Sequence, residues 1–441
     1  MRDFAVSDDP AVQAQLDRLA GLSLPRGRLS LDPVRALLAR LGDPQRALPP
    51  AFHVAGTNGK GSTCTFLRAM LEADGRVVHT FTSPHLVRFN ERIRLAGRLI
   101  DDLALAALLR EVLDAGAGIG ASFFEVTTAA AFLAFARTPA DACVIEVGMG
   151  GRFDATNVLD APAACGIASL GIDHEAFLLV PEPGAPEAPL VRIAWEKAHI
   201  AKPGAPLVVQ AYPGPATAVV TRTATLAGAP LIRQGSEWDA VRRGDALHYR
   251  DRAGAELRLP LPALAGAHQI ANAGLAIAML RHQNELRVSE AALASGLLAA
   301  RWPARLQRLG DGPLTLLAGG RSVWLDGGHN RDAGEALAAH FAKGNARPPL
   351  LHLVLGMLAG KDPAALLMPL RDRLASVAVV PVPGHDAHPG AAFAAHAPVA
   401  VAEYPDVAAA LAALPPGGDV LIAGSLYLAG TVLAANGEVP D

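Results

Sequence analysis

Residues 52–63 read FHVAGTNGKGST, and the rest of the chain is interpreted from this stretch. It begins as a short apolar run, typical of a buried strand, and breaks into glycines around Lys60. Residues 64–75 then repeat apolar side chains at helical spacing. A strand, a glycine-rich turn and a helix predict a phosphate-binding loop. Backbone N–H groups and the positive end of the helix face the anion there, and the lysine reaches the terminal phosphates.

The spacing departs from a strict Walker A motif. That motif would place glycine at Val54 and Ser or Thr directly after Lys60, whereas Gly61 intervenes here. Glycine-rich turns also occur without a phosphate ligand, but the scarcity of lysine favours nucleotide binding. The lysines of the chain are Lys60, Lys197, Lys202, Lys343 and Lys361.

Composition narrows the class of protein. The 441 residues suggest two or three domains, and a hydrophobic content of 51% can fill substantial cores. A net charge of −3 without a basic block gives no indication of nucleic-acid binding. We expect Cys64, Cys143 and Cys165 to be free thiols, since their spacing is not that of a metal site. Residues 1–15 lack the apolar stretch that is typical of a signal peptide, and no run of 18 apolar residues occurs, so we expect a cytoplasmic enzyme.

The order of apolar runs predicts an α/β fold with a mostly parallel sheet of the P-loop type, followed by a smaller Rossmann-like α/β domain. We place the boundary at RWPARLQRLG, so that the domains span residues 1–300 and 301–441. Residues 233–262 predict a small antiparallel insertion, and residues 268–300 are expected to be helical. The expected strands lie near residues 52–56, 77–82, 142–148, 165–170, 206–210, 322–326, 351–355, 376–382 and 419–424.

Polar side chains follow several of these strands, at the edge where ligands bind in open parallel sheets. Glu146 ends one strand, as a carboxylate that holds Mg²⁺ does in nucleotide-binding proteins. Ser83 ends the neighbouring strand and could ligate the same ion, although taken alone the residue favours a turn before Pro84. His174, after Asp173, ends another strand; imidazole is an unusual magnesium ligand, so the residues alone leave its role open.

Together these motifs resemble the bacterial folylpolyglutamate synthase/dihydrofolate synthase family, relatives of the Mur ligases. The resemblance spans nearly the whole chain. The motifs, in the family's order, are GTNGKGST, TSPHLVRFNERIR, SFFEVTTAAAFLAF, EVGMGGRFDATN, GIDH, AWEKAHIAKPG, HQIANAGLAIA, RWPARLQ, LDGGHN and GSLYLAG.

The resemblance implies an ATP-dependent ligase that joins L-glutamate to dihydropteroate and to reduced folates through an acyl phosphate. It implies ATP and two Mg²⁺ ions as cofactors, with a monovalent cation as a further option, and a monomer. The resemblance also implies that Lys60, His174 and Lys197 act in catalysis and that Lys197 is carried as a carbamate. Without the resemblance, Lys197 would be interpreted as an ordinary surface lysine in a helix. We expect the neighbouring Lys202 to be exposed in a turn.

The resemblance also assigns ligands to individual residues. It assigns ATP to Thr57, Asn58, Gly59, Lys60, Gly61, Ser62, Asn272, Arg305 and Asp326. It assigns the metal to Ser83, Glu146, His174 and the Lys197 carbamate, and the glutamate side to His329. It assigns the pteroate or folate to Leu29, Ser30, Leu31, Ser122, Phe123, Phe124, Glu125, Phe153, Asp154 and Ala155. Phe123 and Phe124 fit a hydrophobic core equally well.

Two departures from the family pattern leave alternatives open. Arg28 and Pro33 stand where members often carry an acid and an arginine, in the loop expected to close over dihydropteroate. A Pro-rich insertion, PEPGAPEAP, separates His174 from Lys197. The altered loop around Arg28 and Pro33 allows a single-activity synthase as an alternative to the bifunctional enzyme. An alternative from another class is a catalytically inactive nucleotide-binding regulator, against which the presence of Lys60, Glu146, His174 and Lys197 counts.

Overall fold

The computed structural model describes residues 6–22, 30–342 and 350–441, which divide into two compact units. Unit 1 comprises residues 1–263 and 269–300, and unit 2 comprises residues 264–268 and 301–441. Residues 264–268 thus go with unit 2, and Ala265 packs against its core. Among the described residues, no helix is both long and apolar enough to cross a membrane.

Unit 1 is built on an eight-stranded sheet. The strands from β2 to β8 in this order are parallel, while β3 and β4 form an antiparallel edge. Side by side, they are β4 (Arg98–Leu99), β3 (Ile93–Leu95), β2 (Val78–Phe81), β5 (Ala142–Glu146), β1 (Ala51–Ala55), β6 (Ala164–Ile167), β7 (Leu207–Val209) and β8 (Leu231–Arg233). The central strands are buried along their whole length, which explains why they read as continuous apolar runs.

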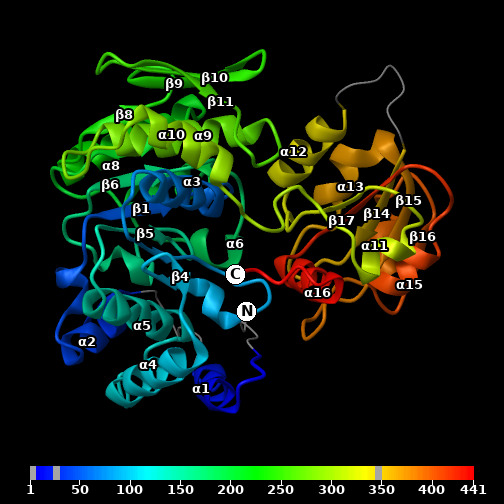
Figure 1. The fold of residues 1–441 in the computed structure, drawn as a ribbon, viewed down its shortest axis with the longest axis horizontal. Coiled ribbons are helices and arrows are strands. Elements are labelled where there is room, and N and C mark those ends of the chain that lie inside the picture. Colours follow the sequence, from blue (N-terminus) through cyan, green and yellow to red (C-terminus); the bar gives the residue numbers. More distant parts are fainter. Residues whose placement is uncertain (1–5, 23–29, 343–349) are drawn as a thin grey trace. The chain divides into compact units, whose positions relative to one another are not determined.

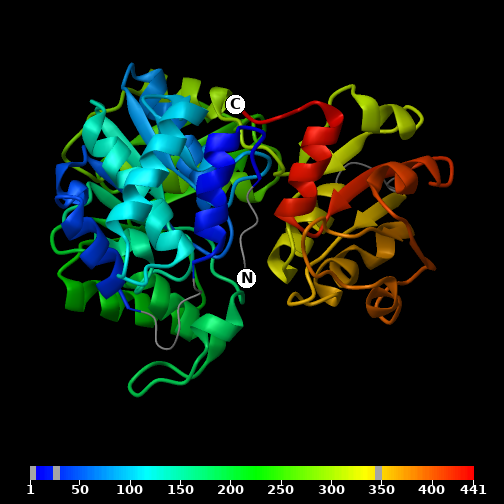
Figure 2. The same ribbon diagram turned by 90° about the horizontal axis from the view of Figure 1, so that it is seen from below.

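Helices cover both faces of this sheet (Figure 1). The N-terminal group of helices, blue to cyan in Figure 2, shares one apolar core with β2 and β5. It contains α1 (Pro10–Ala20), α2 (Asp32–Arg40), α4 (Asp102–Ala115) and α5 (Phe123–Arg137), with the short turns η1 (Pro44–Ala47), η2 (Phe89–Arg92) and η3 (Ala155–Val158). The other helices of unit 1 are α3 (Lys60–Ala73), α6 (Glu175–Leu178), α7 (Pro189–Ala198), α8 (Gly214–Ala227), α9 (His268–Arg281, whose first residue belongs to unit 2) and α10 (Glu290–Ala299).

The predicted antiparallel insertion is confirmed as a separate three-stranded sheet. It consists of β9 (Trp238–Arg243), β10 (Ala246–Asp251) and β11 (Glu256–Pro260). Its inner face packs on α9, where Gly274 leaves room for Ala240 and Trp238. The predicted start was early by a few residues, because β8 ends at Arg233 as a parallel strand of the large sheet.

Unit 2 is a smaller α/β unit with a six-stranded sheet. Side by side, its strands are β12 (Gln307–Arg308), β13 (Val323–Leu325), β17 (Asp419–Ala423), β14 (Leu351–Leu355), β15 (Leu374–Val379) and β16 (Val401–Glu403), all parallel except β12. Its helices are α11 (Pro313–Leu317), α12 (Arg331–Phe341), α13 (Ala364–Leu370), η4 (Arg371–Arg373), α14 (Gly390–Ala394), α15 (Val407–Ala412) and α16 (Leu426–Asn436). The expected parallel strands are present, whereas the short edge strands β12 and β16 were not predicted.

Candidate functional site

The loop between β1 and α3 has the form of a phosphate cradle. Its backbone turns at Gly59, whose φ of 83° is unfavourable for residues with a Cβ atom. A Cβ there would also lie 2.5 Å from Oδ1 of Asn272. Thr57 ties the loop to the strand end after β6, with its N–H donating to the Ser169 carbonyl at 2.8 Å and its hydroxyl to the Gly171 carbonyl at 2.9 Å. Free N–H groups at the start of α3 are thereby fixed in direction.

Two lysines converge on one carbonyl of this loop. Nζ of Lys60 donates to the Gly56 oxygen at 3.1 Å, and Nζ of Lys197 donates to the same oxygen at 3.0 Å. Lys197 comes from the last turn of α7 and is only 3% exposed. Burial, and secondarily the charge of Lys60, lowers the pKa of Lys197 to about 7. An anion in the loop would meet two amino groups from different helices.

A carboxylate lies at the neighbouring strand end. Glu146 closes β5, is 4% exposed, and its Oε2 accepts a hydrogen bond from the Ser83 N–H at 3.2 Å. Within residues 6–22, 30–342 and 350–441, no three His, Cys, Asp or Glu side chains gather as a ready-made metal cage. This donor set fits Mg²⁺, which is commonly held by one or two carboxylates, water and substrate phosphates.

His174 stands after the next strand end, beyond β6. Its φ of 55° places it in the left-handed region directly before α6, a conformation often found at functional positions. Oδ1 of Asp173 accepts the His174 N–H at 2.8 Å and stabilises this turn. The imidazole is 38% exposed, so it is available to a ligand at the strand ends.

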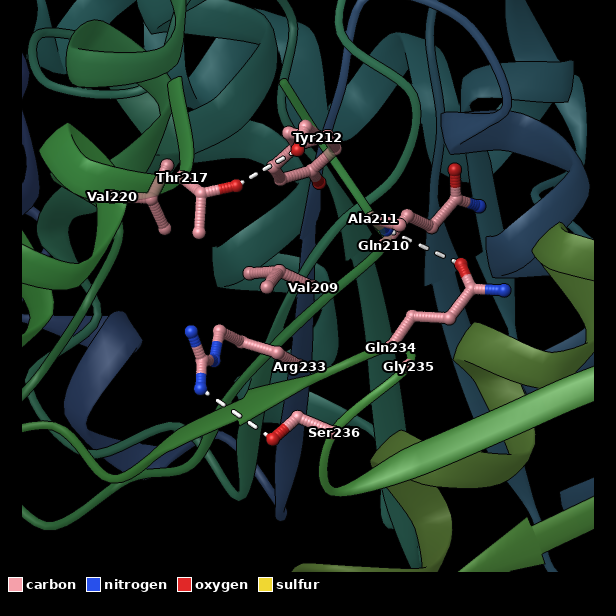
Figure 3. A pocket seen from close by; sticks show the side chains of 10 residues that line it. All are labelled: Val209, Gln210, Ala211, Tyr212, Thr217, Val220, Arg233, Gln234, Gly235 and Ser236. Carbon is pink, nitrogen blue, oxygen red and sulfur yellow. Dashed lines mark hydrogen bonds between the residues drawn. The ribbon is translucent and has the colours of Figure 1, made fainter. Parts of the chain in front are cut away.

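Asn272, expected to contact the nucleotide base, lies in α9 beside Gly59. Its amide is already oriented by two glutamines: Gln210 donates to its Oδ1, and it donates to Gln269, each at 3.1 Å. Gln210 also lines a cavity of about 210 Å³ at the ends of β7 and β8. Figure 3 shows the Gln210 and Gln234 side chains directed to one side of this cavity and Arg233 to the other.

An ion-pair cluster beside Lys197 was not predicted. Arg152 follows the glycines of the loop after β5, and Arg192 precedes Lys197 in α7. Both arginines pair with Glu182 and Glu196. The sequence signal was weak because Glu182 lies in a proline-rich insertion with no regular spacing to the other members. Lys202 also differs from expectation: it is half-buried and donates to the Asn157 carbonyl at 3.2 Å, where an exposed position was predicted.

The residues assigned to pteroate occupy two neighbouring segments. Ser122 and Glu125 form a capping box at the start of α5, with the Ser122 N–H donating to the Glu125 carboxylate at 2.7 Å. Phe123 and Phe124 are half-buried, and the Phe124 ring packs against Gly148 in the loop after β5. The assigned positions thus border the loop that follows Glu146.

The second pteroate segment lies in that same loop. Phe153 stacks under the Arg152 guanidinium at 4.2 Å, and Asp154 is buried, as is Ala155. The Asp154 carboxylate accepts from the N–H groups of Met149 at 2.8 Å and Thr156 at 3.0 Å, so it shapes the loop.

Three assigned residues lie near the N-terminus. Leu29 falls outside the described residues, as does Arg28. Ser30 accepts the Asp32 N–H at 3.0 Å, and Leu31 precedes α2.

In unit 2, Arg305, Asp326 and His329 come together around one turn. Asp326 directly follows β13, and its carboxylate accepts the N–H groups of Leu306 and Gly328, each at 2.7 Å. The residues on both sides of Arg305 have positive φ, 54° at Ala304 and 47° at Leu306. His329 bonds the Gly327 carbonyl at 3.0 Å. Backbone strain of this kind is maintained only where surrounding contacts enforce it, and it concentrates at functional sites.

Comparison with known proteins identifies the family. No family model matches the chain. The dihydrofolate synthase/folylpolyglutamate synthase of Bacillus subtilis is 37% identical over 322 residues, covering 69% of this chain and 70% of the relative. The structure of Escherichia coli FolC in complex with DHPP and ADP matches with a TM-score of 0.84 and 31% identity, over 97% of each chain.

A further solved structure, a bifunctional folylpolyglutamate synthase/dihydrofolate synthase with Mn, AMPPNP and L-glutamate bound, matches with a TM-score of 0.82. It is 31% identical and covers 96% of this chain and 97% of its own. The predicted resemblance and the predicted mixed α/β fold are both confirmed. The chain belongs to the dihydrofolate synthase/folylpolyglutamate synthase family of ATP-dependent ligases.

Proposed function

We propose that this chain catalyses both reactions of its family, adding L-glutamate to dihydropteroate and to reduced folates at the loop between β1 and α3. The observation that carries the proposal is the convergence of Lys60 and Lys197 on the Gly56 carbonyl, beside the buried carboxylate of Glu146. Relatives with ADP and DHPP, or with Mn, AMPPNP and L-glutamate, support this choice of ligands.

The residues suit the chemistry of amide formation from a carboxylate. A carboxylate is a poor acylating agent, so the γ-phosphoryl group of ATP is first transferred to a substrate oxygen, with release of ADP. The amino group of glutamate then attacks the acyl carbon, phosphate leaves, and the amine loses a proton. N–H groups of α3 and the Lys60 ammonium neutralise charge on the transferring phosphoryl group and hold it in line.

Ser83, Glu146 and His174 are the residues that would hold magnesium, which neutralises phosphate charge when bound. Lys197 joins them as a carbamate: its neutral amine adds to CO₂, an N–C bond forms, and one proton is released. Burial supports this role, because it lowers the pKa of Lys197 to about 7 and so makes a neutral amine available near neutral pH. A monovalent cation, a monomeric state and a cytoplasmic location are parts of the same proposal.

In unit 2, the proposal assigns ATP to Arg305 and Asp326 and the glutamate side to His329. We propose that the strained turn presents the Arg305 guanidinium for phosphate, while the Asp326 carboxylate holds the N–H groups of Leu306 and Gly328. Asn272, held by two glutamines, is oriented to contact the nucleotide.

The decisive experiment measures ATP- and Mg²⁺-dependent incorporation of labelled glutamate, in parallel with dihydropteroate and with tetrahydrofolate. Incorporation into both acceptors is expected. Incorporation into tetrahydrofolate alone would leave a single-activity folylpolyglutamate synthase and implicate Arg28 and Pro33; incorporation into dihydropteroate alone would leave a dihydrofolate synthase. ATP binding without incorporation into either acceptor would favour the inactive regulator.

A further inference from the structure

The Pro-rich insertion between His174 and Lys197 is anchored through Glu182. The Glu182 side chain is 15% exposed and makes a bidentate pair with Arg152, with Nη1 to Oε1 at 3.1 Å and Nη2 to Oε2 at 2.5 Å. The same Oε2 accepts from Nη2 of Arg192 at 3.1 Å. Two parallel bonds to a planar guanidinium fix orientation as well as distance.

Arg152 also contacts Glu196, the residue before Lys197, and so links Glu182 to the end of α7. Its guanidinium donates to both carboxylate oxygens of Glu196, at 2.9 and 3.2 Å, and lies over the Trp195 ring at 4.2 Å. Its backbone N–H donates to the Glu196 carbonyl at 2.9 Å. The side chain and the main chain of Arg152 therefore both hold the last turn of α7.

Charge balance makes Glu182 necessary to this arrangement. The cluster contains two arginines and two glutamates, and none of the four side chains is more than 15% exposed. Removing one carboxylate leaves an unpaired cation in a site with little water, and the remaining groups then rearrange. Such rearrangement moves the end of α7, because Arg152 contacts it at three points.

We propose that Glu182 is a positioning residue, which, through Arg152 and Arg192, sets the end of α7 so that Lys197 reaches the phosphate loop. The inference rests on the proposed role of Lys197. The insertion between His174 and α7 would then supply the anion that fixes the helix bearing Lys197.

The test compares Glu182→Gln with Glu187→Gln, which removes the same charge from an exposed position in the same insertion. Each variant is assayed for kcat and for the KM of tetrahydrofolate, and its carbamate is detected by ¹³C NMR after incubation with ¹³C-bicarbonate. We expect Glu182→Gln to lower kcat about tenfold, with little change in KM, and to weaken the carbamate signal. Glu187→Gln should match the unaltered protein.

Glu182→Asp keeps the charge and guards against a Gln variant that fails to fold. It should restore part of both kcat and the carbamate signal. A lower Tm in Glu182→Gln or Glu182→Asp with kcat and signal unchanged would overturn the inference, because the cluster would then act on stability alone. Normal turnover in Lys197→Ala would instead remove the role of Lys197 in the proposed function, and with it this inference. An inactive Lys197→Ala beside a normal Glu182→Gln would overturn the positioning role only.

Discussion

Two pairs of cationic side chains, each with one member in α7, differ in how their charge is balanced. Arg152 and Arg192 are neutralised by Glu182 and Glu196. Lys60 and Lys197 instead direct their ammonium groups at backbone carbonyls, and among the described residues no carboxylate accepts a hydrogen bond from either.

This difference separates side chains that support the fold from side chains that are placed to act on a ligand. A buried charge needs a partner, so a cluster whose charges balance within the chain stabilises the fold. Two amines that donate to a backbone carbonyl can act on groups from outside: Lys60 as an ammonium on phosphate, and Lys197, whose pKa is lowered to about 7, as the amine that forms the proposed carbamate. The same comparison explains why we expect Lys197 to be sensitive to its neighbour: Glu196, which pairs with both arginines, and Lys197 are consecutive residues of α7.

The largest expected effect comes from replacing Lys60, at the start of α3. Lys60→Ala removes the charge that meets the terminal phosphates, and turnover should fall about 10³-fold or more. Labelled-glutamate incorporation measures the loss, and thermal unfolding should show a folded protein. Activity within tenfold of the unaltered chain would contradict the phosphate-loop assignment.

Lys197→Ala should lower turnover about 10²-fold while folding is retained, since it removes the amine that forms the proposed carbamate beside the Gly56 carbonyl. Lys202→Ala is the matched control, because that half-buried lysine bonds Asn157 away from the loop. Equal activity of the two variants would remove the distinction between the lysines.

A smaller effect is expected where the two groups meet. A Cβ at Gly151 would lie 2.8 Å from the Glu196 carbonyl and 3.0 Å from Cα of Lys197, so Gly151→Ala must displace the end of α7. We expect kcat to fall about tenfold. Gly214→Ala is the control, because a Cβ there has no atom within 4 Å and the backbone φ is ordinary. Unchanged kcat in Gly151→Ala would mean that α7 can shift without consequence.

The smallest effect at neutral pH is expected from His53, a titratable residue of β1, the strand that leads into the phosphate loop. Its Nε2 bonds Thr156 at 2.8 Å, and Nδ1 has no hydrogen-bond partner. Burial lowers the pKa of His53 from 6.5 to about 3. Between these values the unfolded chain binds a proton that the folded chain does not, so the free energy of unfolding falls as pH drops.

Urea denaturation at a series of pH values measures this slope. The group contributes at most about 1.4 kcal/mol per pH unit, and only below about pH 6.5. His53→Gln should flatten the acid side of the profile and leave stability above pH 7 little changed in its pH dependence. Parallel profiles for the two proteins would show that folding does not lower the pKa of His53.

The sequence by itself determined the α/β class, because buried parallel strands read as apolar runs and their polar ends mark one edge of a sheet. It also indicated the family, since long motifs of chemically specific residues recur in a fixed order. The short edge strands β3, β4, β12 and β16 escaped prediction because two or three residues carry too little periodicity.

Only the tertiary structure decided which charged side chains meet. Lys60 and Lys197 are 137 positions apart and share one carbonyl, while Glu182, in an irregular proline-rich segment, closes an ion-pair cluster with Arg152. Such contacts depend on how helices α3 and α7 and the loop after β5 pack in three dimensions. Side-chain charge can be read along the chain, but its compensation depends on distance and burial, which only the fold supplies.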